Sequence, residues 1–138
     1  MADERAYSDE FLAAQRAKLL AERERFAEQV RDIDADIIRL GQDQKDEGSG
    51  VGNHMADEGS DAQEQDNDFG IRANIEAVLA EVDHALTKFD LGTYGICEDT
   101  GVPIPEARLE RLPYARYTVA AQEKREKAGT FRAIPSIR

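Results

Sequence analysis

Apolar residues recur every seven positions along the first third of the chain. The stripe consists of Leu12, Leu19, Phe26, Ile33 and Leu40, and Val30 and Ile37 add a second position to its later half. Such a repeat predicts a long α-helix that packs against a partner helix. Ser8 and the two acidic residues after it form a favourable helix start, and the glycine at position 41 predicts the end of the helix.

A second apolar stripe follows with alternating spacings of four and three residues. It consists of Ile75, Leu79, Val82, Leu86 and Phe89, widened by Ile71 and Val78. This pattern predicts a helix that starts near Ser60 or Asp61 and ends before Gly92. Two helices with one narrow stripe each favour an antiparallel hairpin with its tip between residues 48 and 60. A parallel homodimer is the alternative, but it would place the acidic connection between the two helices halfway along the assembly.

The predicted tip is acidic, and so is the whole chain. Between Asp43 and Asp68 there are nine acidic residues and one lysine, and the formal net charge is −11. Such a surface disfavours direct DNA or RNA binding and favours a protein partner with basic surfaces. The single cysteine, the charged N-terminus and the lack of a long apolar run predict a cytoplasmic protein without a membrane span. With the hairpin preferred to a homodimer, the chain is expected to be a monomer.

The last third of the chain is rich in turns. A knuckle at 95–101 precedes an extended Pro-containing segment, a short helix predicted at 106–112 and a final helix predicted at 114–127. The predicted fold is all-α: an N-terminal tail at 1–7, a coiled-coil hairpin at 8–90 with an acidic tip around 46–62, a small globular part at 91–128, and a loose tail at 129–138. Apolar candidates for packing the globular part are Tyr94, Ile96, Val102, Ile104, Leu109, Leu112, Tyr114, Tyr117 and Val119.

Three stretches resemble the DksA/TraR family of bacterial transcription regulators. Leu91–Gly101 is similar to the family's G-x-Y-G-x-C-x-x-C-G entrance to a zinc finger, and Ile104–Pro113 is similar to its I-x-x-x-R-L-x-x-x-P segment. Asn53–Asp57 resembles a D-N-H-P-A-D run at the family's hairpin tip. The resemblance implies the same order of elements: long helix, tip, long helix, zinc finger and closing helix.

The family's four zinc-binding cysteines are mostly replaced. The matching positions are Cys97, Thr100, Thr118 and Ala121. Structural zinc requires four nitrogen or sulfur donors, so we expect no zinc here and a globular part held by apolar packing. His54 and His84 lie on the predicted hairpin and are not expected to substitute as ligands, and Cys97 is expected to be a small buried residue.

Family resemblance implies a partner and a mechanism. Members bind bacterial RNA polymerase and insert the hairpin through its secondary channel, so that the tip approaches the active site. Asp57 matches one functional tip aspartate, while His54 replaces the other; Glu58 and Asp61 are the next candidates. The tip is expected to modulate initiation rather than to hold a second Mg²⁺ for transcript cleavage, because its glycine-rich flank is a poor scaffold for a metal.

Basic residues gather near the end of the chain. They are Arg108, Arg111, Arg116, Lys124, Arg125 and Lys127. The resemblance implies that such residues contact ppGpp at the polymerase interface in some members; ordinary solvated helix faces with contacts to the polymerase rim are the alternative. A helical scaffold that has lost polymerase regulation also remains open. The chain offers no organised nucleophile or acid–base constellation, so it is not expected to be an enzyme.

Overall fold

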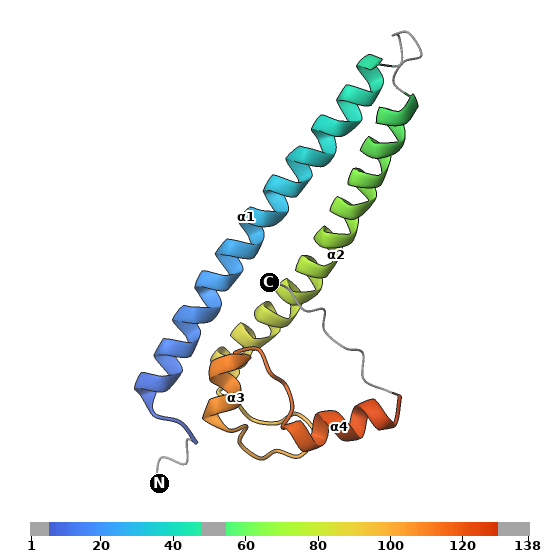
Figure 1. Cartoon of the computed structure of the whole chain (residues 1–138). Helices are drawn as coiled ribbons and strands as arrows, with labels where there is room; N and C mark the ends of the chain where they lie inside the picture. The colour runs from blue at the N-terminus through green and yellow to red at the C-terminus, as the bar shows by residue number, and fades with distance from the viewer. Residues whose placement is uncertain (1–5, 48–54, 130–138) are drawn as a thin grey trace.

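The computed structural model describes the backbone of residues 6–47 and 55–129 and the side chains of residues 6–42 and 62–129. Helices α1 (Asp9–Glu47) and α2 (Met55–Leu91) form a long antiparallel hairpin (Figure 1). Two short helices, α3 (Glu106–Arg111) and α4 (Val119–Lys127), form a small globular part beside the base of this hairpin. The predicted all-α hairpin architecture is therefore confirmed. None of the helices in the described ranges is long and apolar enough to cross a membrane.

Helix α1 begins as its sequence predicts. The Ser8 hydroxyl accepts a hydrogen bond from the Phe11 amide at 3.1 Å, which satisfies one of the orphan N–H groups of the first turn. The seven-residue stripe faces α2, and Leu19, Phe26 and Leu40 are almost completely buried. This burial supplies the main stabilisation of a helix that would be unsupported in isolation.

The predicted end of α1 at Gly41 is wrong, because the helix continues to Glu47. Leu40 remains buried, and Gln65 of α2 donates a hydrogen bond to the Ile37 carbonyl at 3.1 Å. An internal glycine costs a helix only about 1 kcal/mol relative to alanine, and the contacts with α2 outweigh that cost. The start predicted for α2 near residue 60 is also wrong, because α2 begins at Met55.

The buried side of α2 changes along its length. Ile75, Val78 and Val82 are buried against α1, as their spacing predicts. Ile71 was predicted to widen this face, but it is 50% exposed. At that level the contact between the helices is polar instead: the Arg72 guanidinium donates to Asp34 at 2.5 Å.

Between α2 and α3 the globular part consists of turns rather than helices or strands. Ile96 and Pro103 form an isolated antiparallel bridge, and the Ile104 amide donates to the Gly95 carbonyl at 2.7 Å. Gly95 has a φ of 80°, and a Cβ at this position would lie 2.5 Å from the ring of Tyr7. Only glycine satisfies both the conformation and the close approach.

The last helix starts later than its sequence predicts. Residues 114–118 form turns and bends, and α4 begins at Val119. Thr118 is its N-cap, since its hydroxyl accepts a hydrogen bond from the Ala121 amide at 3.3 Å. Of the apolar residues expected to pack the globular part, Tyr94, Ile104 and Leu109 are buried, whereas Val102 and Val119 are about half exposed, which corrects the expectation for these two.

Candidate functional site

Helix α3 is docked onto the hairpin by a side chain that the apolar pattern does not reveal. Gln15 of α1 is 3% exposed and donates hydrogen bonds to the Tyr94 hydroxyl at 3.0 Å and to the Leu109 carbonyl at 2.8 Å. The Leu109 carbonyl has no helical partner four residues on, because Pro113 has no N–H. Tyr94 in turn donates to the Pro113 carbonyl at 2.8 Å. Gln15 therefore completes the C-terminal end of α3.

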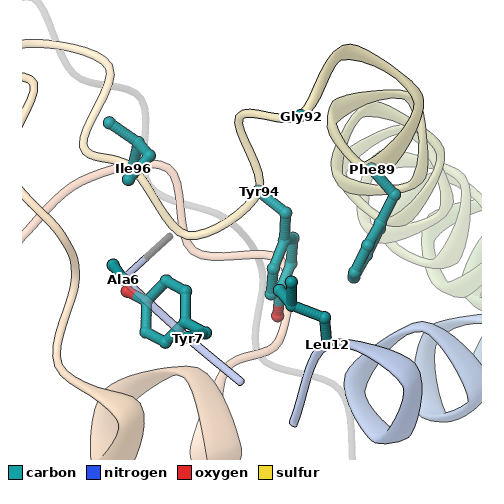
Figure 2. Close-up of a pocket in the computed structure, with 7 residues that line it drawn as sticks. All are labelled: Ala6, Tyr7, Leu12, Phe89, Gly92, Tyr94 and Ile96. Atoms are coloured by element: carbon teal, nitrogen blue, oxygen red, sulfur yellow. The ribbon is translucent and has the colours of Figure 1, made fainter. Parts of the chain in front are cut away.

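Tyr7 closes the base of the molecule from the other side, although it was assigned to an N-terminal tail. Its hydroxyl lies within hydrogen-bonding distance of the Gly95 and Ile104 carbonyls. Its ring lines a cavity of about 570 Å³ together with Leu12, Phe89 and Tyr94, and Figure 2 shows these side chains. A sequence signal exists in retrospect: Tyr7 precedes the N-cap Ser8, and Leu12 is four residues beyond that cap, which is the spacing of a hydrophobic staple.

Hydrogen bonds join three of the four positions that match the family's zinc ligands. The Thr118 amide donates to the Cys97 sulfur at 3.5 Å, and the Thr118 hydroxyl lies 3.9 Å from the same sulfur. That hydroxyl also caps the Ala121 amide. The Thr100 side chain is close enough to Cys97 to help lower the pKa of its thiol. The knuckle fold thus brings all four positions together.

Cys97 itself is 1% exposed and belongs to the core of the globular part, as its small apolar character predicts. Burial alone would raise the pKa of its thiol. Hydrogen bonds from the Thr100 side chain and from the amides of Thr118, Thr100 and Asp99 outweigh burial and lower the pKa to about 7. The turn therefore still presents donors to this sulfur.

These residues do not fit a structural zinc ion. Zinc requires four nitrogen or sulfur donors, and this set offers one thiol, two hydroxyls and a methyl group. The Thr118 hydroxyl is committed to its helix cap. Across 6–42 and 62–129, moreover, no group of three or more His, Cys, Asp or Glu side chains is arranged to hold a metal ion.

His84 lies on the hairpin as predicted, but it is close to the knuckle. Its Nε2 atom is 2.6 Å from the Glu98 carboxylate, so it contacts the neighbour of Cys97 rather than the sulfur. Buried Lys88 also approaches Glu98 at 3.3 Å. Burial would raise the pKa of Glu98, but His84 and Lys88 outweigh it and lower that pKa. This network fastens the knuckle to α2.

Three members of the basic cluster are engaged within the molecule. Arg116 donates to both oxygens of Glu81 at 2.7 and 2.9 Å. Arg125 forms a similar fork with Asp99, and Arg108 donates to the Tyr117 carbonyl at 2.9 Å. Bidentate pairs of this kind fix side-chain geometry. These arginines are neighbours along the chain, but in the structure each of them forms a different contact that holds the globular part.

Two other members of the basic cluster, Arg111 on α3 and Lys124 on α4, have exposed side chains. They are therefore oriented toward a surface that a partner can reach.

The predicted tip residues lie at the far end of the hairpin. The backbone of Asp57, Glu58 and Asp61 belongs to the first turns of α2, so these residues are helical rather than in a loop. Their side chains, and the whole of His54, lie outside the described residues. The described hairpin therefore separates this acidic end from the globular part by the length of α2.

Comparisons with known proteins agree with this architecture. The family model for the prokaryotic dksA/traR C4-type zinc finger matches residues 92–127. The RNA polymerase-binding transcription factor DksA of Caulobacter vibrioides is 30% identical over 125 residues, which cover 91% of this chain and 82% of that protein. General stress protein 16O of Bacillus subtilis is 49% identical over 74 residues, which cover 54% of this chain but only 45% of that protein.

A solved structure, that of transcription factor DksA2 from Pseudomonas aeruginosa, has the same fold. It matches with a TM-score of 0.75 over 95% of both chains at 21% identity. The geometry defines a class of protein: helical hairpins with a zinc-finger-like knuckle at the base. Given 30% identity over 82% of the Caulobacter protein, the chain belongs to the DksA/TraR family.

Proposed function

We propose that this protein is a transcription regulator that binds bacterial RNA polymerase by inserting its hairpin through the secondary channel. The observation that carries the proposal is the match over 91% of the chain to a relative named as an RNA polymerase-binding transcription factor. The match includes the hairpin as well as the knuckle. We further propose that the protein acts as a cytoplasmic monomer and does not contact DNA directly.

The hairpin has the dimensions and charge for this role. Helix α1 contains 39 residues, so the rod is about 58 Å long at 1.5 Å per residue. Such a narrow rod can reach a site inside a channel that a compact domain cannot enter. Helix α2 contains ten acidic and two basic residues, and this charge favours a channel lined with basic groups over nucleic acid.

Asp57 is the proposed working residue of the tip, with His54, Glu58 and Asp61 as its neighbours. Its carboxylate would alter initiation by interacting with mobile elements or with promoter contacts near the polymerase active site. Holding a second Mg²⁺ for transcript cleavage is the competing role for the acidic residues. Transcript shortening in stalled complexes that depends on Mg²⁺ and on this protein would favour that alternative.

The basic residues of the globular part have different proposed roles. Arg108, Arg116 and Arg125 hold internal contacts, so we propose that they are mainly structural. Arg111 and Lys124 are exposed, and we propose that they contact the polymerase rim. A ppGpp phosphate at the same interface would use these two residues first, since binding it through the other three would break hydrogen bonds that hold the globular part.

We also propose that the globular part folds without zinc. Hydrogen bonds among the knuckle, Thr118 and the start of α4, together with the burial of Cys97, do what metal bonds do in a four-cysteine finger. Metal analysis of the purified protein should find well under one equivalent of zinc, and a strong chelator should leave the thermal unfolding temperature unchanged. Zinc near one equivalent would refute this proposal.

The test of function compares two carboxylate deletions on α2. Wild type, Asp57→Ala and Asp66→Ala are each assayed for co-elution with RNA polymerase and for an effect on transcription in vitro. Asp66 is an exposed acid nearer the base, so its variant loses the same charge away from the tip. Asp57→Ala should bind but lose the regulatory effect, whereas Asp66→Ala should retain both.

If wild-type protein neither co-elutes with the polymerase nor changes transcription, the proposed function is wrong. If both variants regulate like wild type while binding is retained, the role of Asp57 is wrong. Binding without any effect on transcription by the wild type would favour a helical scaffold instead.

A further inference from the structure

One face of the hairpin carries two large apolar side chains that the fold itself does not bury. Ile38 of α1 is 60% exposed and Phe69 of α2 is 53% exposed. Leu20 and Thr87 line a shallow groove on one face of the hairpin near its base. Ile38 follows Leu20 by 18 residues, and Phe69 precedes Thr87 by 18 residues. Eighteen residues are about five helical turns, so Ile38 and Phe69 lie on this same face, about 27 Å closer to the tip.

Other residues hold the two helices together at this level. Leu40 is buried, Gln65 donates a hydrogen bond to the Ile37 carbonyl, and Arg72 pairs with Asp34 at 2.5 Å. Ile38 and Phe69 are more than half exposed, so they contribute little to holding α1 against α2. Single exposed apolar residues are common, but two on one face of a highly charged rod form a surface that gains from being covered.

A second copy of the chain is a poor occupant of this surface. The net charge of −11 would oppose face-to-face packing of two hairpins. Two side chains also cover far less than the roughly 1,200 Å² that a stable interface buries in total. A better occupant is a partner that already surrounds the hairpin and offers an apolar recess with basic borders. Such a recess suits the acidic charge of the hairpin and the small area of the two side chains.

We infer that Ile38 and Phe69 form an apolar anchor that seats the hairpin against the wall of the RNA polymerase channel. This inference rests on the proposed function and adds a specific contact to it. The anchor would fix how deeply the hairpin enters the channel. It would also fix the rotation of the hairpin about its long axis, because a single apolar pair can match the channel wall in only one orientation. Charge alone, spread along α2, would not select that orientation.

The experiment measures the affinity of five proteins for purified RNA polymerase: wild type, Ile38→Ala, Phe69→Ala, the double variant and Ile71→Ala. Ile71→Ala is the matched control, because Ile71 is 50% exposed but lies two residues, or about 200°, around α2 from Phe69. Alanine favours the helical state, so circular dichroism should show unchanged helicity in every variant. Sedimentation of each free protein reports self-association.

The double variant should bind at least about tenfold more weakly than wild type, and Ile71→Ala should stay within about twofold. Wild-type affinity in the double variant would overturn the anchor while leaving the proposed function intact. The anchor would also be overturned if wild type formed a dimer and the double variant were monomeric with unchanged polymerase affinity. In that case the face would bind a second copy of the chain. If wild type does not bind polymerase, the proposed function fails, and the anchor fails with it.

Discussion

Replacing Gln15 with leucine tests how the globular part is joined to the hairpin. Leucine has a similar volume and suits a buried helical position, so the substitution mainly removes two hydrogen bonds. Both acceptors are buried, and the Leu109 carbonyl cannot recover a partner from Pro113. Each lost bond is worth about 1 kcal/mol, and a buried carbonyl without a partner costs about 1–3 kcal/mol. We therefore expect a loss of about 2–4 kcal/mol in the free energy of unfolding.

Urea unfolding followed by two probes measures this loss. The chain has no tryptophan and four tyrosines, at positions 7, 94, 114 and 117, so tyrosine emission reports the base of the molecule. Circular dichroism reports mainly the long hairpin. Lys18→Ala is the control, because its bond to the Glu110 carbonyl is exposed and 3.2 Å long; its expected effect is within about 0.5 kcal/mol. A Gln15→Leu protein as stable as this control would refute the reasoning.

Three further substitutions have defined outcomes. Gly95→Ala should lower the free energy of unfolding by about 2–4 kcal/mol, because Gly95 has a positive φ and an added Cβ would meet the Tyr7 ring. Gly101→Ala is the control: Gly101 also has a positive φ but faces open space, so this substitution should cost only about 1 kcal/mol. Glu98→Gln should flatten acid unfolding. The lowered pKa of Glu98 gives stability that is fully present above the ordinary value of 4.5 and is lost as the pH falls through the lowered, folded-state pKa. Wild type and variant should therefore differ in stability at pH 7 and converge once the pH is below that lowered pKa. Thr118→Val should cost about 1 kcal/mol in thermal unfolding through loss of the α4 cap; an unchanged melting temperature would contradict that role.

The basic cluster illustrates why partners are hard to infer from sequence. Arg116 and Glu81 are 35 residues apart, and Arg125 and Asp99 are 26 residues apart. Nothing in the local pattern distinguishes an arginine that will hold such a pair from one that will face solvent. The tertiary packing decides it, because the core that Leu109 and Ala121 share with the hairpin brings these distant segments together.

The sequence by itself determined the hairpin, the end of α2 before Gly92, the short helix after Pro105 and the incomplete metal set. Periodicity, caps and glycine positions act within a few residues, so they can be read directly. Only the tertiary structure decided that α1 continues past Gly41, that Tyr7 and Gln15 close the base, and that His84 reaches Glu98. These outcomes depend on contacts between distant segments, whose burial and hydrogen bonds outweigh local preferences.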